Sequence, residues 1–215
     1  MRRARQIAAA LLALATVARA DEPPIGRAAI LDDLHAYYDS ERVTGLLFGG
    51  LGVVSAGAGT ALVFQSGDFE RGLGWTLLSM GALEILGGGY YALAVGGEIR
   101  HYSTSLKSDA AAFKVEEGTH IEGTISRFPF YRVGELVVAA AGIGVAAYGF
   151  ASKHPVWGGI GVGVAGESLS LFTLDAFGQA RAHAYDRQIR RFYPTLALSV
   201  GGGDHPWGAS VSGRF

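Results

Sequence analysis

The sequence predicts a mainly α-helical membrane protein: four helices of membrane-spanning length form two hairpins, a β-hairpin follows at the C-terminus, and several copies assemble into a homo-oligomeric ring. Three observations support this fold class. Four long stretches are almost free of charged residues. Glycine occurs 33 times in 215 residues, about twice its average frequency. The last residues alternate between apolar and polar side chains up to a terminal phenylalanine.

The composition excludes several other classes of protein. Hydrophobic residues make up 49% of the chain, too many for a disordered protein. A formal net charge of −1 argues against nucleic acid as a partner. Without cysteine there are no disulfides, thiolate metal sites or cysteine nucleophiles. The six histidines have no i,i+4 pair and no G-x-S-x-G motif occurs. We therefore expect no enzyme activity, no catalytic residue, no cofactor and no metal.

Residues 1–20 have the features of a secretory signal peptide. Arg2, Arg3 and Arg5 precede an apolar run of 11 residues from Ile7 to Val17, too short to span a bilayer. Small residues at 18 and 20 then offer a cleavage site. We expect cleavage after residue 20, with an uncleaved membrane anchor as the alternative.

Four stretches are each long enough to cross about 30 Å of hydrocarbon as a helix. The first has no charged residue and the other three have one or two acidic residues each. Connections of five and two residues join them in pairs, which predicts two helical hairpins. The stretches are residues 43–66, 72–97, 133–152 and 155–178, within a membrane domain of residues 43–192.

Two more polar segments flank these stretches. Residues 21–42 form an amphipathic N-terminal segment, with Leu34 and Tyr37 on one side and Asp32 and Asp39 on the other, which we expect at the membrane interface. The polar middle segment, residues 98–132, separates the hairpins. We expect it to begin as a helical extension and to form a loop or short strand pair at residues 116–126.

The hairpins resemble a weak internal repeat. Arg42-Val43 and Arg132-Val133 open their first helices, and a tryptophan followed nine or ten residues later by a glutamate occurs in both second helices. The alternative is chance similarity between two glycine-rich apolar segments.

Glycine spacing predicts how these helices pack. In lipid, helices associate by close backbone contact through small residues rather than by hiding apolar surface. Pairs of small residues four apart occur in several stretches. The candidate packing residues are Gly45, Gly49, Gly59, Gly159 and Gly163.

Three acidic residues are candidate functional residues because they lie within the apolar stretches. Ionisable groups inside a membrane are costly and commonly functional. Glu84, Glu135 and Glu167 form either an ion path or a structural set held by Arg42, Arg132 or nearby serines. We favour the structural interpretation.

The last segment, residues 193–215, predicts a β-hairpin. A glycine-rich turn at residues 201–206 separates two stretches of period two. The second stretch has its apolar side at Trp207, Ala209, Val211, Gly213 and Phe215. It resembles the C-terminal strand by which the barrel-assembly machinery recognises bacterial outer-membrane proteins.

In lipid, strands must close into a barrel of about eight or more, so two strands per chain require at least about four copies. The alternative is a soluble hairpin on a periplasmic surface.

The exported chain, the apolar helices and the strand ending in Phe215 together resemble the ring-forming, lipid-trapping outer-membrane proteins of predatory bacteria and their relatives. The resemblance implies a structural protein without an active site. Its partners would be further copies of itself, membrane lipids and the barrel-assembly machinery.

Two topology signals conflict for an inner-membrane protein. The hairpin turns carry only Arg71 and Lys153, so the positive-inside bias places the other side in the cytoplasm. A cleaved signal peptide places that side in the periplasm. The two signals conflict less in the outer membrane, where the positive-inside bias need not apply, and this is the location we expect. The alternatives are an inner-membrane transporter or channel subunit that uses the glutamates, and a soluble periplasmic adaptor.

Overall fold

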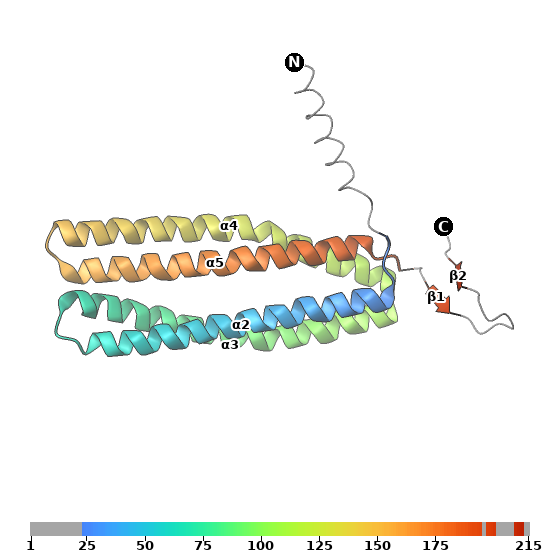
Figure 1. Cartoon of the computed structure of the whole chain (residues 1–215), viewed down its shortest axis with the longest axis horizontal. Coiled ribbons are helices and arrows are strands. Elements are labelled where there is room, and N and C mark those ends of the chain that lie inside the picture. Colours follow the sequence, from blue (N-terminus) through green and yellow to red (C-terminus); the bar gives the residue numbers. More distant parts are fainter. Residues whose placement is uncertain (1–22, 195–196, 201–208, 213–215) are drawn as a thin grey trace, which may run out of the picture.

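A computed structural model describes residues 23–194, 197–200 and 209–212 of the chain. Within residues 23–194 it consists of four long helices: α2 (Arg27–Val63), α3 (Asp68–Ser108), α4 (Ala110–Ala151) and α5 (Pro155–Arg191). The α2/α3 hairpin lies beside the α4/α5 hairpin (Figure 1). The predicted helical hairpins are confirmed, and all four helices are long and apolar enough to cross a membrane.

The helices are longer than one membrane crossing requires. They have 37 to 42 residues, which corresponds to about 55–63 Å, twice the thickness of a typical hydrocarbon layer. Both hairpin turns lie at one end of the bundle, and the α3–α4 connection lies at the other (Figure 1). We call residues 43–97 and 133–178, near the hairpin turns, the apolar half. Residues 27–42, 98–132 and 179–192 form the polar half.

The polar half has a core of large side chains, as in a water-soluble bundle. The apolar side of the amphipathic N-terminal segment packs into this core, because Ile30 and Leu34 are fully buried. That segment therefore continues into α2 and buries its apolar side against protein. The other large apolar side chains that are fully buried in this core are Leu106, Phe113, Ile121, Ile189 and Phe192.

The prediction of a loop or strand pair at residues 116–126 is wrong, because α4 runs through this segment without interruption. Phe113, Glu117 and Ile121 recur every fourth residue and are all fully buried. This burial offsets the low helix propensity of Gly118 and Gly123. The polar middle segment is thus the end of one helix and the beginning of the next.

The turn between these two helices consists of Asp109. Its carboxylate accepts hydrogen bonds of 3.0 Å from the backbone N–H groups of Ala111 and Ala112. Aspartate is a favourable N-cap because it satisfies amides that have no partner within the helix. The hairpins are therefore joined by one capped residue with little freedom to move apart at this end.

Small residues pack the apolar half. Glycines seven residues apart on α2 face glycines seven apart on α3. The facing pairs are Gly45–Gly88, Gly52–Gly81 and Gly59–Gly74. The α4/α5 hairpin repeats this pattern with Gly142–Ala165 and Gly149–Gly158. A Cβ atom added at Gly52 would lie 2.6 Å from the carbonyl oxygen of Gly81, so these helices approach more closely than side chains would allow.

The five glycines predicted to pack helices occupy three kinds of place. Gly45 and Gly59 belong to the α2–α3 contact. Gly159 and Gly163 face α3 from α5 and join the two hairpins. Gly49 has room for a Cβ atom, with Gly89 N as its nearest neighbour at 3.8 Å. Small residues four apart also form these contacts, because a Cβ atom at Gly88 would meet the backbone of both Gly45 and Gly49, and one at Gly161 would meet that of both Gly142 and Ala146.

The C-terminal segment contains two short strands, β1 (Ala197–Val200) and β2 (Ala209–Ser212). They pair antiparallel, with Ala197 opposite Ser212 and Val200 opposite Ala209. The predicted signal peptide at residues 1–20 and the predicted strand residues Trp207, Gly213 and Phe215 lie outside the described residues. A membrane-inserted hairpin that closes a shared barrel stays a prediction.

Candidate functional site

Two of the three glutamates predicted inside the membrane face each other. Glu84 on α3 is 2% exposed, Glu167 on α5 is 4% exposed, and their carboxyl groups interact electrostatically. Within the described part of the chain, neither oxygen of Glu84 has a hydrogen-bond partner. Glu84 points inward because it shares its helix face with Gly81 and Gly88, which pack against α2. The pair therefore lies buried where the two hairpins meet.

The third glutamate belongs to a separate group. Glu135 on α4 interacts with Asp175 on α5 and with Arg132 one turn away. Arg132 donates a hydrogen bond of 3.1 Å from Nη1 to Gln179, and its guanidinium lies 4.5 Å from the centre of the Phe172 ring. Arg132 therefore offsets part of the charge of this acidic pair, while Glu135 Oε2 and Arg132 Nε have no hydrogen-bond partner among the described residues.

A third polar group lies at the boundary between the two halves. Arg181 on α5 donates to Glu41 on α2, with 3.1 Å between Nη2 and Oε1. It also donates to the hydroxyl of Thr44 at 2.6 Å. The Tyr91 hydroxyl donates to the second oxygen of Glu41 at 2.6 Å. This network connects three helices and leaves the buried Glu41 carboxylate fully paired.

A fourth carboxyl group lies in the core of the polar half. Glu117 has no exposed surface and accepts a hydrogen bond of 3.0 Å from the Tyr38 hydroxyl. The rings of Tyr102 and Tyr185 flank Tyr38, at 5.9 and 6.4 Å between centroids. Burial raises the pKa of Glu117 to about 7, although hydrogen bonds from tyrosine hydroxyls act in the opposite direction. Glu117 therefore titrates near neutral pH.

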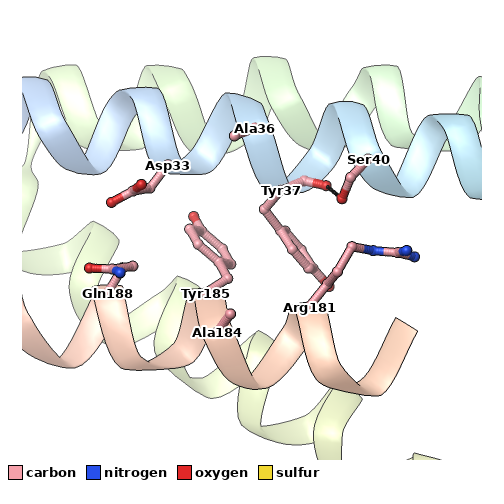
Figure 2. Close-up of a pocket in the computed structure, with 8 residues that line it drawn as sticks. All are labelled: Asp33, Ala36, Tyr37, Ser40, Arg181, Ala184, Tyr185 and Gln188. Carbon is pink, nitrogen blue, oxygen red and sulfur yellow. Dashed lines mark hydrogen bonds between the residues drawn. The ribbon is translucent and has the colours of Figure 1, made fainter. Parts of the chain in front are cut away.

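A surface groove runs between α2 and α5 in the polar half, and Figure 2 shows its eight lining residues. Its volume is about 290 Å³. Tyr37 and Tyr185 extend from opposite helices and stack at 4.5 Å between centroids. Arg181, one of the lining residues, is already paired with Glu41, so this groove mainly shows how α5 is held against α2.

A larger cavity lies between the two hairpins at the boundary of the apolar and polar halves. Its volume is about 530 Å³, and all four helices line it. Phe48, Gly87 and Leu171 contribute from the apolar half, whereas Glu98 and His120 contribute from the polar half. The cavity therefore offers apolar walls and carboxylates in one space.

The sequence analysis did not identify the buried carboxyl groups of Glu41 and Glu117. Glu41 lies 140 residues from Arg181, and Glu117 lies 79 residues from Tyr38. No local pattern links residues so far apart. Asp175, near the end of the last apolar stretch, lies beside Glu135 on the neighbouring helix. The signal available in the sequence was the spacing of four residues between Phe113, Glu117 and Ile121, which puts Glu117 on an apolar helix face.

Among the described residues, no group of three or more histidine or acidic side chains is arranged to hold a metal ion. No known protein family, curated protein or solved structure matches this chain. Its function is therefore inferred from its own geometry.

Proposed function

We propose that this protein is an outer-membrane structural protein that assembles as a homo-oligomeric ring enclosing lipid or a pore, with its C-terminal strands closing a shared barrel. The carrying observation is the outer surface of the apolar half. Large apolar side chains there are open to the surroundings, among them Leu86 at 70% and Leu93 at 80% exposure. In water such a surface would be a liability, whereas lipid and neighbouring subunits can cover it.

Glycines that face outward support contact with other copies. Gly50 and Gly57 on α2, and Gly89 and Gly96 on α3, are again seven residues apart. Among the described residues, no atom lies within 4 Å of a Cβ position at any of them. Within a single chain these glycines only lower helix stability. In lipid, a face of small residues allows a second helix to approach closely.

The strand pair supports the same assembly. In the described part of the chain, β1 and β2 pair only with each other, so each has an outer edge that a neighbouring copy can extend. A spanning sheet in lipid must be closed. Strands from several copies would supply that closure.

The test is the mass and shape of the particle extracted in mild detergent, with density-gradient fractionation of the two membranes. We expect a ring of several copies in the outer-membrane fraction. Gly50→Leu with Gly57→Leu should reduce the copy number, because leucine blocks close approach on that face. Gly123→Leu, at an open glycine in the polar half, is the matched control. Wild-type protein that is a monomer in the inner membrane would contradict the proposal.

The Glu84–Glu167 pair favours a second candidate function, an inner-membrane transporter or channel subunit. A buried intramembrane carboxyl group without a hydrogen-bond partner, such as that of Glu84, is a candidate for binding a proton or cation. Proton and sodium flux in liposomes should then be lost in Glu84→Gln with Glu167→Gln, and kept in Glu70→Gln near the α2–α3 turn. Absence of flux in the wild type, or flux that the double variant keeps, would exclude this function.

A further inference from the structure

The cavity between the hairpins has the size and position of a ligand site. Its volume of about 530 Å³ falls in the usual range for small-molecule sites, about 300–1,000 Å³. Residues of all four helices line it, so it exists only where the two hairpins come together. It lies where the apolar half meets the polar half.

Aromatic side chains form much of its wall. They come from α2, α3 and α4 and combine an apolar ring face with, in the tyrosines, a polar hydroxyl. The aromatic lining residues are Tyr37, Tyr38, Phe48, Tyr91, Phe128 and Tyr131. A ring face attracts a cation through the negative electrostatic potential above it.

The charged side chains in the cavity wall also favour a positively charged ligand. Glu41 is neutralised by Arg181, which leaves Glu98 and Asp175 as carboxylates in the lining. Asp175 also interacts with a second acid, Glu135, and both acids interact with the single guanidinium of Arg132. Arg127 is the one guanidinium among the lining residues, and its side chain is exposed to solvent. An anion would meet more carboxylates than cations here.

We propose that this cavity binds an organic cation with an apolar body, such as an aromatic phosphonium or a quaternary ammonium compound. The apolar body would lie against Phe48, Leu171 and Leu174 on the side of the apolar half. The positive charge would lie toward Glu98 and Asp175, over the tyrosine rings. This site does not depend on whether the chain forms a ring or conducts ions.

The experiment measures binding of two probes of nearly equal shape and opposite charge, tetraphenylphosphonium and tetraphenylborate. Full-length protein in lipid nanodiscs is dialysed against each probe, and empty nanodiscs of the same lipid give the background. We expect saturable binding of the phosphonium, one per chain, at least about tenfold tighter than that of the borate. Equal binding of both probes, tighter binding of the borate, or phosphonium retention no greater than in empty nanodiscs would overturn the proposal.

Variants assign the binding to this cavity. Glu98→Gln with Asp175→Asn keeps the side-chain shapes and should weaken phosphonium binding by about tenfold or more. Glu122→Gln, an exposed acid paired with Arg190, should leave it unchanged. Tyr131→Leu removes one ring from a half-exposed position and should also weaken binding, which keeps the test valid if the double variant misfolds. Unchanged affinity in Tyr131→Leu and in a folded double variant would place the site elsewhere.

Discussion

The Glu117 carboxyl group is buried in the core of the polar half, so it must either lose its hydration as a carboxylate or bind a proton. It has no exposed surface, and the Tyr38 hydroxyl donates to it. Burial disfavours the ionised form, so the pKa rises from the ordinary value of 4.5 to about 7 in the folded state. A tyrosine hydroxyl stabilises a carboxylate but does not replace water completely. Glu117 therefore couples folding to pH.

We expect Glu117→Gln to reduce the pH dependence of stability. Because the folded state holds this proton more tightly than the unfolded state, its contribution is fully present below about pH 4.5 and is lost as the pH rises through about 7. At about pH 8 the glutamine variant should be more stable than the wild type by up to about 3 kcal/mol. Urea unfolding in detergent, followed by circular dichroism at about pH 5 and pH 8, measures this. The exposed Glu122→Gln is the control, and equal pH slopes in Glu117→Gln and the wild type would contradict the assignment.

The Glu41–Arg181 pair should contribute more to stability than the surface pairs. Arg181→Met would leave the Glu41 side chain, which is 10% exposed, without its cation, at a cost of about 2–3 kcal/mol. Arg190 is 62% exposed and pairs with Asp186 and Glu122, so Arg190→Met should cost less than about 1 kcal/mol. Unfolding midpoints of both variants provide the comparison. Similar losses would mean that solvent screens both pairs alike.

At the scale of the elements, each half of the bundle packs as its solvent requires. In water, burying large apolar side chains drives association, and the polar half has such a core. In lipid, that driving force is absent and close contact between small residues replaces it. The same helices therefore change from large buried residues to glycines spaced by seven as they pass from one half to the other.

Two glycines of α3 test this packing. A Cβ atom at Gly74 would lie 2.7 Å from Val63 N and 2.8 Å from Gly59 O, both backbone atoms that cannot move independently. Gly74→Ala should therefore separate α2 from α3 and destabilise the fold by about 1–3 kcal/mol. Gly97 has open space at this position, so Gly97→Ala should be neutral or stabilise α3 by up to about 1 kcal/mol. Thermal unfolding of both variants measures this difference in stability. If Gly74→Ala is as stable as Gly97→Ala, the helices are not held at contact distance.

At the scale of the whole molecule, the strands start near the polar end of the bundle. Five residues separate α5 from β1, and such a segment spans at most about 18 Å. The 13 residues of α5 beyond residue 178 correspond to about 20 Å between the apolar half and this end. The connecting segment is therefore long enough to bring the strands back close to the level of the apolar half, as a barrel in the same lipid layer requires.

Removing residues 195–215 separates the contributions of the two regions to assembly. We expect the shortened chain to keep its helix content and its membrane association, because α2–α5 retain every contact described among themselves. It should lose the ring, because the strands that close the shared barrel are gone. Circular dichroism, membrane flotation and particle mass measure the three properties. A ring of unchanged size would show that the helices alone assemble it.

The sequence alone determined the number of long helices, their pairing into hairpins and the burial of Glu84 and Glu167 within apolar stretches. These features depend on length, hydropathy and short connections, which are local along the chain. Only the tertiary structure decided that residues 116–126 are helical, that glycines pack at intervals of seven, and that Glu41, Glu117 and Asp175 find distant partners. The physical reason is that burial and pairing energies arise between helices, and single-helix periodicity does not specify which faces meet.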